Sequence, residues 1–303
     1  MAQQYVNSLP DDTTYINLSG RNLTSLPDLS KFNNLQILDC SLNQLTSLPS
    51  LNQNLQILDC SCNKLTSLPT LNEHLHMLYC SHNRLTYLPT LNEYLQRLDC
   101  YHNQLTSLPT LNDNLLRLYC SDNELTSLPT LNLYLEDLYC YHNQLTSIPP
   151  LNEHLEKLYC SHNQLTSLPT LNKNLRKLDC SHNQLTYLPI LNVNLEELYC
   201  SHNQLTSLPN LNEQLRRLDC HDNPFYVLDS DDNMDIMKQH IYILFRFRFI
   251  YYSVKFKTQF KKWLWERVRE PKIAKKYHPS YLLEHLQDDS NIDEVLTEWV
   301  GDD

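Results

Sequence analysis

Glycine is nearly absent from this sequence of 303 residues, where it occurs only as Gly20 and Gly301. Phosphate-binding loops, dinucleotide-binding fingerprints and nucleophile elbows each need several glycines close together. The sequence therefore excludes these three kinds of site. Its turns have to be made by other residues, and we expect Asn and Pro to make them.

Long hydrophobic runs are also missing. No stretch reaches the ~20 apolar residues that a membrane-spanning helix requires. The first residues, MAQQYVNSLPDD, lack the basic and apolar parts of a secretory signal. No residue pair stands out as a unique nucleophile and base. We expect a protein that is not secreted, has no transmembrane segment and is not an enzyme, with no cofactor, metal ligand or small-molecule substrate.

One unit, L-x-x-L-x-C-x-x-N-x-L-T-x-L-P-x-L-N-x-x, recurs every 20 residues. Such a fixed period predicts a solenoid of stacked coils. The leucines and the cysteine should face inward, alternating with outward residues as in a strand. The first Asn can bond backbone groups of the next coil, and Pro favours extended backbone. The units begin at Leu35, Leu55, Leu75, Leu95, Leu115, Leu135, Leu155, Leu175, Leu195 and Leu215.

The chain divides into three predicted regions. Residues 1–34 form an irregular capping repeat, in which Arg21 stands where Asn is expected and two extra residues precede Leu35. Residues 35–228 form the ten repeats. Residues 229–303 form a small C-terminal domain that is basic and aromatic, with an acidic end.

Ten of the 11 cysteines occupy the inward position of the repeat, from Cys40 to Cys220, and Cys62 alone does not. A cysteine at this position acts as a small core residue. Strands in a sheet lie about 5 Å apart, so an oxidising compartment would favour disulfides between these thiols. The pattern therefore favours free thiols in an intracellular, reducing compartment over a metal site or a redox relay.

Outward positions form two columns on the predicted concave face. The tyrosine column comprises Asp39, Asp59, Tyr79, Asp99, Tyr119, Tyr139, Tyr159, Asp179, Tyr199 and Asp219, and the serine column comprises Ser41, Ser61, Ser81, Tyr101, Ser121, Tyr141, Ser161, Ser181, Ser201 and His221. Tyrosines are favoured at interfaces, although they also stabilise sheets simply by cross-strand packing. The candidate residues for binding a protein partner are Tyr79, Asp99, Tyr101, Tyr119, Tyr139, Tyr141, Tyr159, Asp179 and Tyr199.

A histidine column follows the strands. It comprises Leu42, Cys62, His82, His102, Asp122, His142, His162, His182, His202 and Asp222. Histidines about 5 Å apart could bind a transition metal or respond to pH. Duplication of the repeat explains the column without any ligand, so metal binding along it is the weaker hypothesis.

The segment 236–278 has twelve Lys or Arg against two Glu, whereas the whole chain has a net charge of −11. Aromatic residues at helical spacing predict a long helix there, although the alternation in FRFRFIYYSVKFK also suits a strand. Two short helices are predicted in 279–303. One interpretation is that this basic helix binds nucleic acid or an anionic membrane. The interpretation that we favour is a domain that caps the solenoid.

The repeated LPTLNxxLxxLYCSHNQLTS resembles the leucine-rich repeats of bacterial secreted effectors and, more closely, those of giant DNA viruses. The segment FKKWLWERVREPKIAKKYHPSYLLEHL similarly resembles a C-terminal segment of giant-virus proteins. The resemblance implies an α/β-type leucine-rich-repeat horseshoe, with a parallel concave sheet and extended convex segments. It also implies protein–protein interaction in the cytoplasm of an infected host cell. Some of these effectors carry a ubiquitin-ligase domain with a cysteine nucleophile, but this chain has no cysteine after Cys220.

Overall fold

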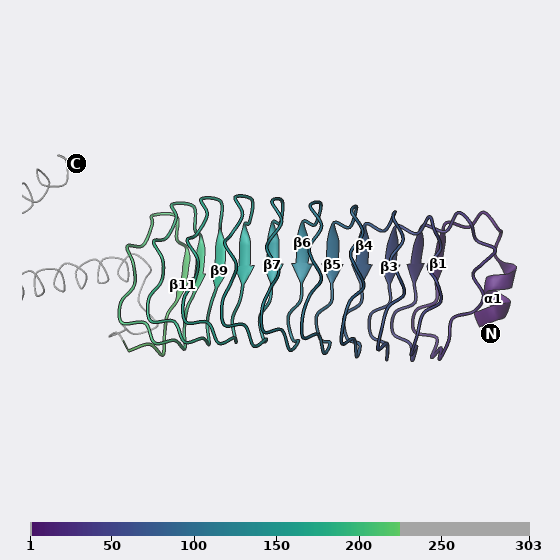
Figure 1. The fold of residues 1–303 in the computed structure, drawn as a ribbon, viewed down its shortest axis with the longest axis horizontal. Coiled ribbons are helices and arrows are strands. Elements are labelled where there is room, and N and C mark those ends of the chain that lie inside the picture. Colours follow the sequence, from purple (N-terminus) through teal and green to yellow (C-terminus); the bar gives the residue numbers. More distant parts are fainter. Residues whose placement is uncertain (1, 225–303) are drawn as a thin grey trace, which may run out of the picture. The chain divides into compact units, whose positions relative to one another are not determined.

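The structure is a computed structural model, and it describes residues 2–224. Helix α1 comes first, and eleven short strands follow it in chain order (Figure 1). The bounds are α1 Ala2–Ser8, β1 Tyr15–Asn17, β2 Ile37–Asp39, β3 Ile57–Asp59, β4 Met77–Tyr79, β5 Arg97–Asp99, β6 Arg117–Tyr119, β7 Asp137–Tyr139, β8 Lys157–Tyr159, β9 Lys177–Asp179, β10 Glu197–Tyr199 and β11 Arg217–Asp219.

The strands form one parallel sheet, in which each strand pairs with the next in sequence. From β2 onward each residue pairs with the residue 20 positions later, as Leu38 pairs with Leu58. Between β1 and β2 the step is 22, because Ile16 pairs with Leu38. The two extra residues in front of Leu35 are therefore accommodated outside the sheet. This is the solenoid that the period predicts, with the sheet along its concave face.

Leucine and cysteine fill the inside of each coil. In the coil of β4, Leu75, Leu78, Cys80 and Leu85 are all fully buried. On the return path, Leu88 and its equivalents in most coils are buried as well, and the backbone there is irregular rather than helical. Within residues 2–224, α1 is the single helix, so the prediction of extended convex segments is confirmed.

Asparagine at the ninth position of the unit joins neighbouring coils. The Nδ2 amide of Asn143 donates to the carbonyl oxygens of Cys120, Cys140 and Tyr141 at 3.1–3.2 Å. Its Oδ1 accepts the backbone N–H of Leu125 at 3.0 Å. One side chain thereby satisfies backbone groups of two coils that a buried turn would otherwise leave unpaired. This role of the repeated Asn is the one that the sequence predicts.

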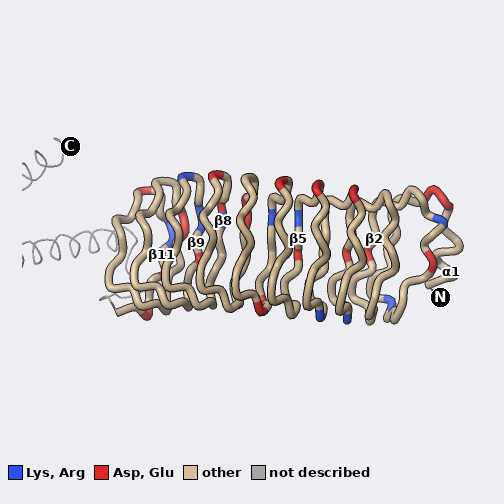
Figure 2. The backbone as a smooth tube through the Cα atoms, in the orientation of Figure 1, with Lys and Arg blue, Asp and Glu red and all other residues tan. Residues whose placement is uncertain are grey.

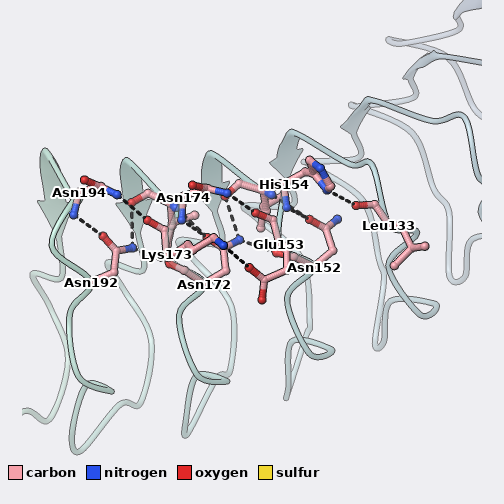
Figure 3. Close-up of polar contacts among 11 residues, drawn as sticks. Leu133, Asn152, Glu153, His154, Asn172, Lys173, Asn174, Asn192 and Asn194 are labelled. Atoms are coloured by element: carbon pink, nitrogen blue, oxygen red, sulfur yellow. Dashed lines mark hydrogen bonds and ion pairs between the residues drawn. The ribbon is translucent and has the colours of Figure 1, made fainter.

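A second ladder of asparagines, each of which precedes a strand in the sequence, also joins neighbouring coils (Figure 3). The Nδ2 of Asn192 donates to the backbone oxygen of Asn172 at 2.7 Å, which links two coils. Asn172 also accepts the backbone N–H of Asn174 on its own Oδ1, and Asn174 in turn donates to the backbone oxygen of Glu153. The repeat unit contains this asparagine, but the sequence analysis predicts no role for it.

The histidine column adopts left-handed backbone. All ten of its residues have φ between 50° and 54°, and Gly20 has the equivalent place in the first repeat. Asn, Asp and His are the residues other than glycine that tolerate this region best. The backbone is held there because, for example, the N–H of His142 donates to Ser161 and that of Asn143 to His162. The bend includes the repeated asparagine, as expected, but the positive φ lies at the residue before it.

The N-terminal region adds the helix α1, which the sequence analysis did not predict. Val6 of α1 and Phe32 are fully buried, and the guanidinium of Arg21 lies 4.3 Å from the ring centre of Tyr5. In residues 2–224 no helix is both long and apolar enough to cross a membrane. The predicted domain 229–303, with its basic helix 236–278 and the two short helices after it, lies outside the described residues.

Candidate functional site

Three tyrosines form a continuous stack at the middle of the concave face. The ring centres of Tyr119 and Tyr139 are 4.7 Å apart, and those of Tyr139 and Tyr159 are 4.4 Å apart. Their planes differ by 26° and 17°. The residues come from β6, β7 and β8, which pair in register, so the repeat alone brings the rings together. All three rings are half-buried.

The stack continues toward the N-terminus through an arginine. The Arg97 guanidinium lies 4.8 Å from the ring centre of Tyr119 and 5.1 Å from that of Tyr79. It also binds the Asp99 carboxylate through two hydrogen bonds of 3.0 Å. Such a two-point pair fixes the guanidinium plane, and a cation over an aromatic face is favourable. Tyr79 and Tyr119 therefore belong to one cluster, although they lie two strands apart.

Charged residues at the first strand position pair with one another. We call Arg97, Arg117, Asp137, Lys157, Lys177, Glu197 and Arg217 the charged column. Asp137 lies 3.1 Å from the Lys157 ammonium and 3.5 Å from the Arg117 guanidinium. Glu197 likewise lies between Lys177 and Arg217. Charges of both signs occur along the strands, as Figure 2 shows. Each anion of the column lies between two cations, so the negative charges of the column are already paired and are not available to a partner.

Burial changes the acid–base behaviour of the face. Desolvation raises the pKa of Tyr139 to about 12, and it also raises the pKa values of Tyr119, Tyr141 and Tyr159. The phenols therefore stay neutral donors at any physiological pH. Asp99 is only 6% exposed, and its burial raises the pKa of its carboxyl while the contact with Arg97 opposes that shift.

The serine column is not the exposed surface that strand alternation predicts. Ser121 is 1% exposed, and Ser81, Ser161 and Ser201 are also buried. Each strand ends two residues before this position, so the alternation of a strand does not extend to it. The tyrosines of this column contact histidines instead. Tyr101 meets His82 edge-on at 5.1 Å, and Tyr141 meets His142 at 5.7 Å.

The histidine column is stacked along much of its length. His142, His162, His182 and His202 lie face to face, with successive ring centres 4.0 Å apart. Near-parallel rings direct their in-plane lone pairs side by side rather than toward one point. The stacked part of the column therefore offers no converging set of metal ligands.

The candidate residues fall into three groups. Tyr119, Tyr139 and Tyr159 form the stack, and the Arg97 contact adds Tyr79 and Asp99 to it. Tyr101 and Tyr141 contact the histidine column instead. Tyr199 is separated from Tyr159 by the strand that carries Asp179. Sequence reasoning placed Arg97 among the charges near the stack but missed its contact with the rings of Tyr79 and Tyr119, although its place two residues before Asp99 on one strand face could have indicated the ion pair.

Comparison with known proteins supports the repeat assignment. Models of the family described as Leucine Rich repeats (2 copies) match residues 135–173, and those of Leucine Rich Repeat match residues 174–192 and 194–212. YopM from Yersinia enterocolitica WA-314 has a similar structure, with a TM-score of 0.65 and 34% sequence identity over 75% of this chain and 55% of that chain. The chain thus spans about half the length of YopM. No curated protein sequence matches the chain.

Two further bacterial structures are similar. The functional domain of InlJ from Listeria monocytogenes, which includes a cysteine ladder, has a TM-score of 0.56 and 26% identity over 72% of this chain and 56% of that chain. A leucine-rich-repeat protein of Leptospira interrogans has a TM-score of 0.51 and 25% identity over 75% of this chain and 88% of that chain. These structures support the resemblance to bacterial effectors, and they give no support to the resemblance to giant viruses.

Proposed function

The chain is a leucine-rich-repeat protein, and we propose that it is a non-catalytic scaffold that binds a protein partner on its concave face. The stack of Tyr119, Tyr139 and Tyr159 carries this proposal. Half-buried tyrosines offer a large contact area, and they are already ordered before a partner arrives. Such residues dominate the binding energy of many interfaces.

The chemistry of the face suggests the chemistry of the partner. Its centre consists of neutral phenol rings, and the charges beside it are already paired, as Asp137 is with Arg117 and Lys157. A partner does not need high charge of one sign to approach. We infer that the partner presents an apolar or aromatic surface with hydrogen-bond acceptors for the phenol hydroxyls, and that the outer charges adjust its register.

We further infer that the protein works in a reducing compartment. The register cysteines are free and buried, and in the described residues none forms a disulfide. The alternative function, binding of nucleic acid or an anionic membrane through 236–278, stays a prediction because it concerns residues outside those described.

The partner site is tested by affinity capture with the full chain as bait. Lysate proteins bound by the natural chain are compared with those bound by the triple variant Tyr119→Ala, Tyr139→Ala and Tyr159→Ala. We expect a specific partner to be lost from the triple variant, since removing one interface tyrosine typically costs about 2 kcal/mol or more of binding.

The matched control is a second triple variant, with Tyr87→Ala, Tyr94→Ala and Tyr187→Ala. These three tyrosines are exposed and lie outside the strands. The control should retain the partner, which separates the concave face from a general loss of exposed aromatic surface. A partner retained by the first variant and lost from the control would move the site to the surface outside the strands.

A further inference from the structure

The histidine column changes geometry at its C-terminal end. His202 ends the parallel stack, and its next ring neighbour, His221, lies edge-on at 4.9 Å with the planes 80° apart. His221 belongs to the serine column, where seven of the ten units have Ser and none of the other nine has His. Asp222 occupies the next place in the histidine column. A third potential ligand thus joins the column at this end.

The three side chains bring their ligand atoms together. The Nε2 of His202 lies 3.2 Å from Oδ2 of Asp222, and the Nε2 of His221 lies 3.6 Å from the same oxygen. Bonds of about 2.0–2.2 Å around a tetrahedral zinc ion place neighbouring ligand atoms about 3.3 Å apart. The two separations from Asp222 are close to this edge length. In the described part of the chain, this is the one group of three such residues whose ligand atoms all lie within 4.8 Å of one another.

A fourth residue orients one ligand. The Nδ1 of His221 is hydrogen-bonded to a carboxylate oxygen of Asp219. The carboxylate can only accept, so Nδ1 carries the proton and the lone pair of the neutral ring is on Nε2, which faces Asp222. A carboxylate behind a ligating histidine is the usual supporting contact of a metal site.

We propose that His202, His221 and Asp222 bind one divalent transition-metal ion of the zinc type, with Asp219 as a positioning residue. Two imidazoles and one carboxylate suit such an ion, and a fourth position stays open to water. His202 follows β10, whereas His221 and Asp222 follow β11, so the bound ion links the last two coils of the described solenoid. This site is separate from the concave-face tyrosines, and its proposal does not depend on theirs.

A similar pair elsewhere provides an internal control. His102 lies 3.6 Å from Asp122, so the histidine and aspartate of the column meet there as well. The residue that corresponds to His221 is Ser121, which is buried, so this pair has no third ligand. His102→Ala should therefore leave zinc binding unchanged.

The test is isothermal titration of the metal-free full chain with zinc chloride, with the half-exposed Cys62 replaced by Ser in every protein compared. The parent of each variant is the chain that carries only Cys62→Ser. We expect His221→Ser, which restores the usual residue of the repeat, to bind one equivalent of zinc fewer than this parent. Asp219→Asn should keep the equivalent and bind it about 10- to 100-fold more weakly. Thermal unfolding without metal checks that each variant folds like its parent.

Two results would overturn the proposal. If His221→Ser binds as many zinc equivalents as its parent with the same affinity, the cluster is an ion-pair network and not a metal site. If His102→Ala loses the equivalent, zinc binds elsewhere along the column. A thermal midpoint that zinc raises in the parent but not in His221→Ser supports an ion held between the last two coils.

Discussion

The ring of Tyr139 is stacked on the ring of Tyr159, with the centres 4.4 Å apart and the planes 17° from parallel. Tyr119 covers the other face of Tyr139 at 4.7 Å. Tyr139 is therefore held between two aromatic rings, although it lies outside the leucine core. The same ring contributes both to the proposed interface and to the stability of the sheet, and these two roles can be separated by substitution.

Tyr139→Ala should lower the free energy of unfolding by about 1–3 kcal/mol, since it removes two aromatic pairs worth about 0.5–1.5 kcal/mol each beyond their buried area. Tyr139→Phe keeps both pairs and should cost less than about 0.5 kcal/mol. Equilibrium denaturation measures both changes. The control is Tyr187→Ala, because Tyr187 is 58% exposed and should tolerate the change. An equal cost for Tyr139→Ala and Tyr187→Ala would show that the stack contributes no stability.

Cys62 should react with a thiol reagent before any other cysteine of residues 2–224. It is half-exposed, whereas Cys140 and the other register cysteines are buried. The thiolate is the reactive form, and burial raises the pKa of Cys120 to about 12, so very little thiolate is present at neutral pH. Timed alkylation of the native protein followed by peptide mass spectrometry measures the order. Labelling of Cys140 as fast as that of Cys62 would contradict the buried ladder.

Asn143→Leu should be strongly destabilising, by at least about 3 kcal/mol, because each buried backbone group left unpaired costs about 1–3 kcal/mol. The carbonyl oxygens of Cys120, Cys140 and Tyr141 would lose their donor, and the N–H of Leu125 its acceptor. Equilibrium denaturation compares it with Gln144→Ala, a change at the exposed neighbouring position. Similar stabilities of the two variants would mean that water replaces the asparagine ladder.

Leu42→Gly should stabilise the protein by up to about 1 kcal/mol, since glycine accepts left-handed backbone without the cost that a side chain adds. Leu42 has φ of 53° and is 62% exposed, so the change removes little packing. Leu42→Val should have the opposite effect, because a β-branched residue is a poor fit to this conformation. Denaturation midpoints of the two variants and the natural chain check the order. Greater stability of the valine variant than of the glycine variant would contradict it.

The sequence predicts most of the solenoid because a fixed period leaves one register. Once Leu38 and Leu58 occupy the same place in their units, the pairing of every later strand follows. The burial of the cysteines follows as well, because their position alternates with the outward residues. The stack of Tyr119, Tyr139 and Tyr159 could likewise be predicted, since residues at one place in paired strands must be neighbours.

The features that the sequence does not predict depend partly on where the strands end. They are three residues long, so an alternation extended to Ser121 places a buried residue outside. Positive φ was missed because its usual signals are glycine and asparagine, whereas here the position is mostly His. The contact of Arg97 with the rings of Tyr79 and Tyr119 depends on side-chain rotamers, which the repeat does not specify. Similarly, two histidines approach Asp222 only because His221 replaces the serine that is usual at its position in the repeat.

The stacked histidines should make stability depend on pH. Burial, and then the neighbouring histidines, lower the pKa of His162 from its ordinary value of 6.5, and the pKa of His182 is lowered for the same reasons. The unfolded chain therefore takes up these protons at a higher pH than the folded chain does. Stability is unaffected above the unfolded value and falls as the pH drops from there toward the lowered folded value, because the unfolded state then binds more protons.

Histidine substitution tests this pH effect. His162→Asn removes one group of lowered pKa, and asparagine tolerates the left-handed backbone at this position. Between about pH 7.5 and about pH 5.5 the variant should lose less stability than the natural chain does. His74→Asn is the control, because His74 is exposed and lies outside the column. Denaturation midpoints across this range, with NMR titration of the ring signals, measure both effects. If His162 titrates at or above 6.5, its stacked neighbours and its partial burial do not disfavour its charged form.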